Sequence, residues 1–129
     1  MKALLLLLLF ISTLQADHVR WQGDFEKARE EAVKEKKELM VLLITSECSE
    51  CMTMLRTTFM NQKYIAYINQ HYVAVLVKRN QKQSYPIELL YTLEYPALFF
   101  LDTQEIYTKE ALFGYITPAI LEKHLQEHL

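Results

Sequence analysis

The chain has 129 residues and two cysteines, Cys48 and Cys51, which are separated by only two residues. They follow an unbroken apolar run at residues 39–44, which predicts a buried strand. Leu55 and Phe59 come after the cysteines at a spacing of four, which indicates the apolar face of a helix. A Cys-x-x-Cys pair between a buried strand and the start of a helix predicts a redox-active pair of thiols.

The positions of the two thiols predict a different role for each. Cys48 would lie at the start of the helix, where unpaired N–H groups and the helix dipole favour the reactive thiolate, so it is the expected attacking group. Cys51 lies one turn deeper and is the expected resolving thiol. A structural disulfide is the alternative, since exported proteins often carry one. A bridge across so short a loop removes little chain entropy, which favours the redox interpretation.

Residues 1–16 have the pattern of a secretory signal peptide. A lysine at position 2 precedes an apolar stretch over residues 3–14 that includes six consecutive leucines, and Ala16 offers a small residue for cleavage. The stretch is short for a membrane span. An uncleaved N-terminal anchor is the alternative, because Leu14 is large for its place in a cleavage site. We therefore expect one mature domain over residues 17–129, in the periplasm or secreted.

The rest of the chain alternates between helical and strand patterns, and its formal net charge of −2 with no basic block argues against nucleic-acid binding. Early strands joined through helices should be parallel, and the last two, joined by a turn, antiparallel. The expected fold class is α/β, with a central mixed β-sheet flanked by helices. Helices are expected at residues 25–37, 48–59, 62–70, 86–91 and from 118 onward. Strands are expected at residues 39–44, 72–77, 94–101 and 106–113, with a short strand or arm at 18–21.

Three landmarks in this order resemble the thioredoxin-like superfamily: Cys-Ser-Glu-Cys at 48–51, Tyr95-Pro96 at the opening of a later strand, and Gly114 before the last helix. The chain is similar to small exported thioredoxin-like proteins and to the C-terminal periplasmic domain of transmembrane thiol–disulfide reductases. The resemblance implies a thioredoxin-like fold over residues 24–125. It also implies a cis peptide bond before Pro96, with Tyr95 and Pro96 beside the cysteines as substrate-binding residues.

The chain departs from the usual thioredoxin pattern around the cysteines. Glu47 stands where thioredoxins usually have tryptophan, Ser49 and Glu50 stand where they usually have Gly-Pro, and Leu42 occupies the position of a buried acid that assists proton transfer. Glu47 and Glu50 are expected to be exposed, and either could replace that acid. Their negative charge disfavours a thiolate at Cys48. We therefore expect a reductase or isomerase rather than a strong oxidant.

The predicted activity is that of a monomeric thiol–disulfide oxidoreductase acting on thiols and disulfides of exported proteins. It needs no cofactor, because the electrons reside in the dithiol, and the family resemblance implies a membrane thiol electron donor. Two alternatives remain open: a Cu(I)-binding chaperone that uses Cys48 and Cys51, and a redox-silent binding module with a fixed disulfide. No metal site is assigned, because zinc needs about four ligands and the four histidines show no ligand spacing with the cysteines.

Overall fold

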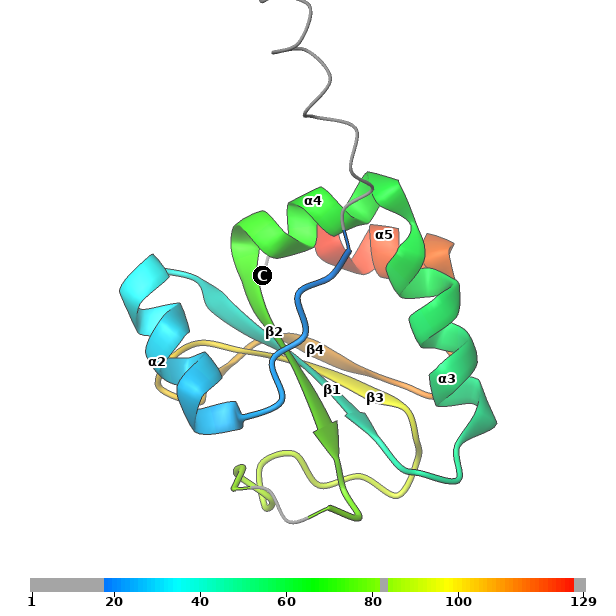
Figure 1. Cartoon of the computed structure of the whole chain (residues 1–129), viewed down its shortest axis with the longest axis horizontal. Helices are drawn as coiled ribbons and strands as arrows, with labels where there is room; N and C mark the ends of the chain where they lie inside the picture. Colours follow the sequence, from blue (N-terminus) through cyan, green and yellow to red (C-terminus); the bar gives the residue numbers. More distant parts are fainter. Residues whose placement is uncertain (1–17, 82–83, 127–129) are drawn as a thin grey trace, which may run out of the picture.

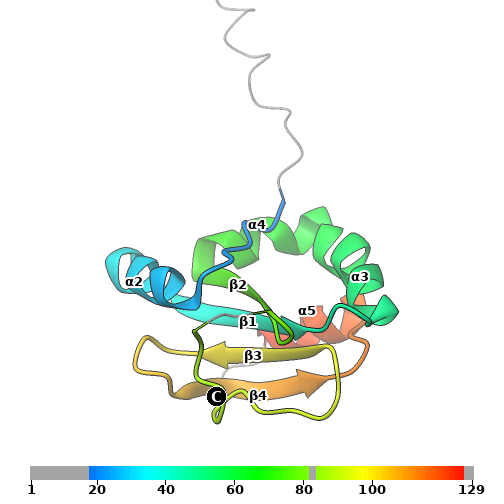
Figure 2. The same ribbon diagram turned by 60° about the horizontal axis from the view of Figure 1, so that its bottom comes forward.

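The computed structural model describes residues 18–81 and 84–126, and its centre is a four-stranded mixed sheet (Figure 1; Figure 2). The strand order is β2-β1-β3-β4, formed by β1 (Glu38–Ile44), β2 (Tyr72–Lys78), β3 (Ala97–Leu101) and β4 (Tyr107–Phe113). β1 pairs in parallel with β2, and β3 pairs antiparallel with both β1 and β4. The predicted mixed sheet is confirmed. The predicted signal peptide lies outside the described residues.

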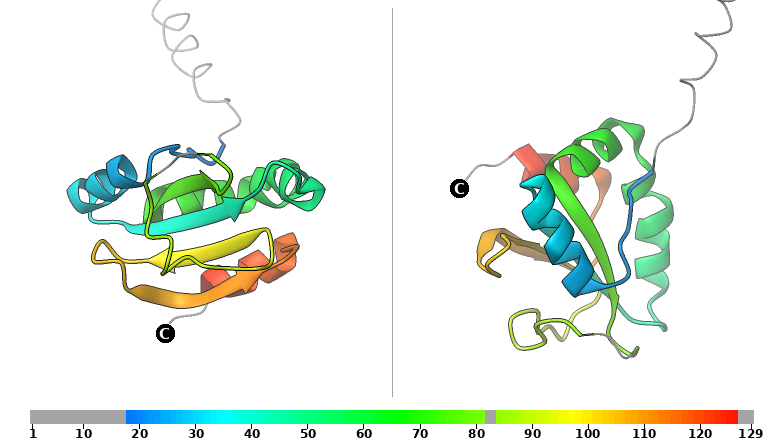
Figure 3. Two further views of the ribbon diagram at one scale, coloured as in Figure 1. Left: turned by 90° about the horizontal axis from the view of Figure 1, so that it is seen from below. Right: turned by 60° about the vertical axis from the view of Figure 1, so that its left-hand side comes forward.

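Helices cover both faces of this sheet. The helix α2 (Phe25–Glu35) packs on one face. The core of the opposite face is built with α3 (Ser49–Arg56), the 3-10 helix η2 (Thr58–Met60), α4 (Gln62–His71) and α5 (Pro118–Gln126). Figure 1 shows α2 on one side of the strands and the other helices gathered on the far side. In the left view of Figure 3, the β3–β4 hairpin lies at the edge of the sheet away from α2.

The central strand β1 is buried on both faces. Every side chain from Leu39 to Ile44 is at most 2% exposed. Because strand side chains alternate between faces, the odd-numbered residues pack with α2, and the even-numbered residues pack in the core formed with α3, α4 and α5. This two-sided burial explains why the segment is uniformly apolar. The strand ends at the edge of the sheet from which the cysteine loop departs.

The residues before α2 form an arm along β2 and not a regular strand. The Gln22 N–H donates to the Ala74 carbonyl at 2.8 Å, and the Leu76 N–H donates to the Gln22 carbonyl at 2.9 Å. This single bridge is parallel, and the side chain of Val19 is buried beside it. Of the two forms expected for residues 18–21, the structure therefore has the arm.

The prediction of a helix over residues 86–91 is wrong. The segment makes a single turn, closed by the Leu90 N–H donating to the Pro86 carbonyl at 3.0 Å. Leu90 is buried and Leu89 packs partly against the same core, whereas Ile87 and Tyr91 are well exposed, so Leu90 is the one fully buried apolar side chain of the segment. A segment of six residues with one fully buried side chain gains too little from packing to offset the cost of nucleating a helix.

Several predicted boundaries also shift. The helix α2 ends early because Lys36 adopts a left-handed conformation with φ 56°, and α3 ends at Arg56, before the separate η2 turn. The strand β3 begins at Ala97, since Pro96 has no N–H for the ladder. The residue spacing in the last helix predicts Ile120, Leu121, His124 and Leu125 largely on one side, but Ile120 is 46% exposed. Within residues 18–81 and 84–126, no helix is long and apolar enough to cross a membrane.

Candidate functional site

The thiol of Cys48 is positioned by the end of β1 and the start of α3. After β1 ends at Ile44, a short turn leads to Cys48, which has extended backbone angles and serves as the N-cap of α3. Its Sγ accepts a hydrogen bond from the Cys51 N–H at 3.1 Å. The cysteine therefore lies at the positive end of the helix dipole, in the place that the sequence pattern predicts.

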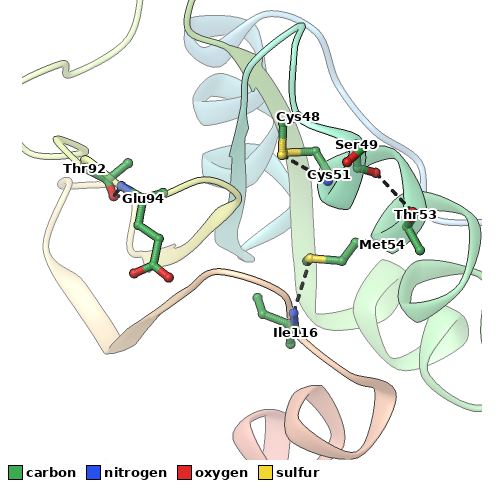
Figure 4. The surroundings of a disulfide bond; sticks show 8 residues. All are labelled: Cys48, Ser49, Cys51, Thr53, Met54, Thr92, Glu94 and Ile116. Carbon is green, nitrogen blue, oxygen red and sulfur yellow. Dashed lines mark hydrogen bonds between the residues drawn. A yellow bond between two sulfur atoms is a disulfide. The ribbon is translucent and has the colours of Figure 1, made fainter.

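Cys48 and Cys51 are joined by a disulfide, and their Cα atoms are 5.3 Å apart (Figure 4). Cys48 is partly exposed, whereas Cys51 is fully buried in the core that also holds Leu42 and Met54. A molecule arriving from solvent therefore reaches the Cys48 sulfur first. In the reduced pair, a thiolate at Cys48 would be stabilised by the Cys51 N–H and by the helix dipole.

The loop that carries Tyr95 and Pro96 lies at the same edge of the sheet as the cysteines. Ala97 pairs with Leu43 near the end of β1, so the loop just before Ala97 approaches the point where the cysteine loop begins. The peptide bond between Tyr95 and Pro96 is cis. The Pro96 carbonyl accepts a hydrogen bond from the Gly114 N–H at 2.8 Å, which ties this loop to the end of β4.

The segment after β4 is held against α3 and η2 through the backbone of Ile116, and Figure 4 shows the bond to Met54 of α3. The Ile116 N–H donates to the sulfur of Met54 at 3.4 Å, and the Thr58 hydroxyl donates to the Ile116 carbonyl at 2.6 Å. All three side chains are at most 1% exposed. Together with the bond from Gly114 to Pro96, these contacts connect the cysteine helix to the proline loop.

The two acidic residues predicted to modulate the site are both exposed. Glu47 lies in the turn before Cys48, and Glu50 lies in the first turn of α3. The side chain of Leu42, at the position of the family's buried acid, is fully buried in the same core as Cys51. The surroundings of Cys51 inside the core are therefore apolar at that point, and the carboxylates lie on the solvent side.

A third carboxylate, which sequence reasoning did not single out, lies on the proline loop. Glu94 is exposed, and its Oε1 lies close to Gly114, where an added Cβ would approach it to 2.7 Å. Its backbone is fixed by Thr92, whose hydroxyl accepts from the Glu94 N–H at 3.0 Å and donates to the Glu94 carbonyl at 2.8 Å. Figure 4 places Glu94 across the site from Ser49.

Sequence reasoning also missed the contacts of Met54, Thr58 and Ile116. Met54 packs in the core, and its sulfur also accepts a hydrogen bond from the Ile116 N–H. No local pattern marks these contacts, because they join residues 58 and 62 positions apart in the chain. In the described part of the chain, no group of three or more His, Cys, Asp and Glu residues is arranged to hold a metal ion.

A family model described as thioredoxin-like matches residues 20–103. A candidate disulphide isomerase from Bacteroides thetaiotaomicron superposes with a TM-score of 0.69 and is 25% identical, covering 84% of this chain and 92% of that one. The DsbH oxidoreductase superposes with a TM-score of 0.68 and is 18% identical, covering 86% of this chain and 85% of that one. The C-terminal domain of Neisseria meningitidis DsbD in its oxidised form superposes with a TM-score of 0.58 and is 14% identical, covering 81% of this chain and 98% of that one. No curated protein matches the sequence.

These likenesses agree with the arrangement of the sheet and its helices. The fold, the family match and the Cys48–Cys51 disulfide together support thiol–disulfide redox chemistry at this site.

Proposed function

Because this chain belongs to the thioredoxin-like family, we propose that it is an exported thiol–disulfide oxidoreductase acting on disulfides of other exported proteins. The observation that carries the proposal is the asymmetry of the disulfide. The Cys48 sulfur is accessible and accepts a backbone N–H at a helix start, whereas Cys51 is buried behind it. This arrangement supports an attacking thiol at Cys48 and a resolving thiol at Cys51.

The reaction follows from these two roles. In the reduced protein, the Cys48 thiolate attacks one sulfur of a substrate disulfide, whose S–S bond breaks as a mixed disulfide forms and one substrate thiolate leaves. The Cys51 thiolate then attacks the Cys48 sulfur, which releases the second substrate thiolate and forms the Cys48–Cys51 disulfide. Two electrons pass from the dithiol to the substrate. A thiol donor must then reduce the pair, and we propose a membrane protein for this step.

Tyr95 and Pro96 are proposed to line the groove that binds the polypeptide around the substrate disulfide. The support is their place at the edge of the sheet from which Cys48 departs, and the bond that holds the Pro96 carbonyl to Gly114. Substrate backbone in an extended conformation would run along this loop. We propose that the protein acts as a monomer. We also propose that it needs no cofactor, because the dithiol supplies the electrons.

The direction of the reaction is proposed to be reduction or isomerisation. Glu47 and Glu50 are exposed on the solvent side of the pair, where their charge disfavours the Cys48 thiolate and so destabilises the reduced state. Both carboxylates are screened by solvent and salt, so the effect is modest. We expect a reduction potential near that of thioredoxin, about −270 mV, rather than near the strongly oxidising value of about −120 mV.

Equilibration of the mature protein with glutathione buffers of known ratio tests the proposal. The fractions of dithiol and disulfide, read by alkylation and mass spectrometry, should give a potential close to that of thioredoxin. A value near the oxidising end would refute the reductase assignment. A pair that stays oxidised in excess dithiothreitol would instead indicate a fixed disulfide, and tight binding of Cu(I) by the reduced protein without turnover of disulfides would indicate a copper chaperone.

A further inference from the structure

The turn that follows β2 contacts both loops of the redox site. Residues 78–81 form this turn, in which the Arg79 N–H donates to the Ile44 carbonyl at 3.0 Å, at the end of β1. The next residue, Asn80, donates from its side-chain amide to the Ser46 hydroxyl at 2.5 Å, two residues before Cys48. The turn is therefore fixed to the cysteine loop by one backbone bond and one side-chain bond.

The same turn reaches the proline loop through the side chain of Arg79. A guanidinium N–H of Arg79 donates to the Tyr95 hydroxyl at 2.9 Å. The guanidinium carbon also lies 5.8 Å from the centre of the Tyr95 ring, within the range of a cation–π contact. Tyr95 is half-buried, so the contact fixes the exposed end of a ring whose other end packs in the core.

We propose that Arg79 is a positioning residue that holds Tyr95 in place and thereby gives the redox site its affinity for polypeptide disulfides. This inference rests on the proposed function and names the substrate class that the site prefers. Arg79 does not act on the sulfurs. It connects the cysteine loop to the residue before Pro96, so the wall along which a substrate backbone would lie is formed before the substrate arrives. A side chain that is already held in its bound position loses less conformational entropy when substrate binds than a mobile one does.

The preference follows from what each kind of substrate can touch. A small disulfide needs only the exposed sulfur of Cys48, so the orientation of Tyr95 contributes little to its binding. A polypeptide disulfide extends past the sulfur along the proline loop, and there it meets the ring that Arg79 holds. Loss of Arg79 should therefore weaken polypeptide binding more than it slows the chemical step.

Single-turnover kinetics with the reduced mature chain, residues 17–129, test this inference. The polypeptide probe is fluorescein-labelled insulin, whose fluorescence rises when its interchain disulfides are reduced, and the small probe is the neutral disulfide dithiodipyridine. For Arg79→Ala, the insulin concentration at half-saturation should rise about threefold to fivefold, the size of an exposed cation–π contact. The maximal rate should fall less than that, and the ratio of insulin to dithiodipyridine reactivity should drop by a similar factor.

Matched variants separate positioning from charge. Arg79→Lys keeps the positive charge but loses the planar group, so it should resemble Arg79→Ala. Tyr95→Phe removes the hydroxyl and should show part of the effect, and adding it to Arg79→Ala should cause little further loss. Arg29→Ala is the control, because Arg29 is a partly exposed arginine with a side-chain hydrogen bond to Glu26 on α2, away from the cysteines, and it should behave as wild type.

Each outcome bears on the inference in a different way. Full recovery in Arg79→Lys would show that charge alone matters and would overturn the positioning role. Equal losses with insulin and dithiodipyridine, or additive effects of Arg79→Ala and Tyr95→Phe, would overturn it as well. If the wild-type protein reduced neither probe, the proposed function itself would fail, whereas a wild type that reduces both and matches Arg79→Ala would refute only this inference.

Discussion

The hydrogen bond from Thr58 to the backbone of Ile116 offers a direct test of what holds the site together. The Thr58→Val substitution keeps the size and branching of the side chain and removes only the hydroxyl. In the wild-type protein this hydroxyl donates to the Ile116 carbonyl at 2.6 Å, and both residues are 1% exposed. The substitution therefore leaves a buried carbonyl oxygen without its donor.

The expected cost follows from this burial. A buried polar group that loses its partner costs about 1 to 3 kcal/mol, because water cannot replace the lost bond. With Ile116 almost fully enclosed, we expect a loss near the middle of this range, about 2 kcal/mol. For a domain of this size that corresponds to a fall in Tm of about 8 °C. Thr58→Ser keeps the hydroxyl and loses one methyl group, so it should cost only about 1 kcal/mol.

Urea unfolding of the oxidised protein, followed by circular dichroism, measures these differences. The midpoint for Thr58→Val should fall by about 1 to 2 M with an unchanged slope. Thr57→Val is the matched control, since Thr57 is the neighbouring residue and its hydroxyl donates to the Thr53 carbonyl at 2.8 Å in an exposed position. Water can replace that bond, so the control should stay within about 0.5 kcal/mol of wild type.

The reasoning would be refuted if Thr58→Val cost no more than Thr57→Val, or if Thr58→Ser cost more than Thr58→Val. In either case the Ile116 carbonyl would not depend on the hydroxyl, and packing alone would hold the segment after β4 against η2.

Three further predictions concern the cysteines and the loops around them. Cys51→Ser should accumulate mixed disulfides with substrates, seen by non-reducing electrophoresis, whereas Cys48→Ser should not; trapping by both variants would contradict the assigned roles. The double substitution of Glu47 and Glu50 by glutamine should raise the reduction potential, and an unchanged potential would mean that the two acids are spectators. Gly114→Ala should lower the free energy of unfolding by about 1 to 2 kcal/mol because φ is +79°, a region that alanine avoids. A melting temperature equal to that of wild type would exclude this strain.

The elements that could be predicted from the sequence are those that a local pattern determines. The uniform apolar run of β1 predicted a strand buried on both faces, and the spacing of the two cysteines placed Cys48 at the start of α3, where the structure has it. The turn of residues 102–104 predicted the antiparallel closing pair of strands. In these cases the residues that decide the structure lie within a few positions of one another.

The features that could not be predicted depend on contacts across the fold. The helix expected at residues 86–91 fails because Leu90 is its one deeply buried anchor, a fact set by the strands it packs against. The contacts of Arg79 with Tyr95 and of Met54 with Ile116 join side chains to distant groups, and each of these side chains suits many other roles. Neither periodicity nor composition carries information about such pairs.

The order in which the chain is made gives the Ile116 contacts a further consequence. The cysteines precede the proline loop by more than forty positions, and they precede Ile116 by more than sixty. Synthesis proceeds from the amino terminus, so both cysteines of a nascent chain are made before the proline loop and the segment around Ile116 that pack near them in the folded protein. Until the carboxyl-terminal segment docks on Met54 and Thr58, the core that buries Cys51 lacks Ile116, Leu121 and Leu125. The difference in burial between Cys48 and Cys51 is thus complete only after the last segment of the chain has folded.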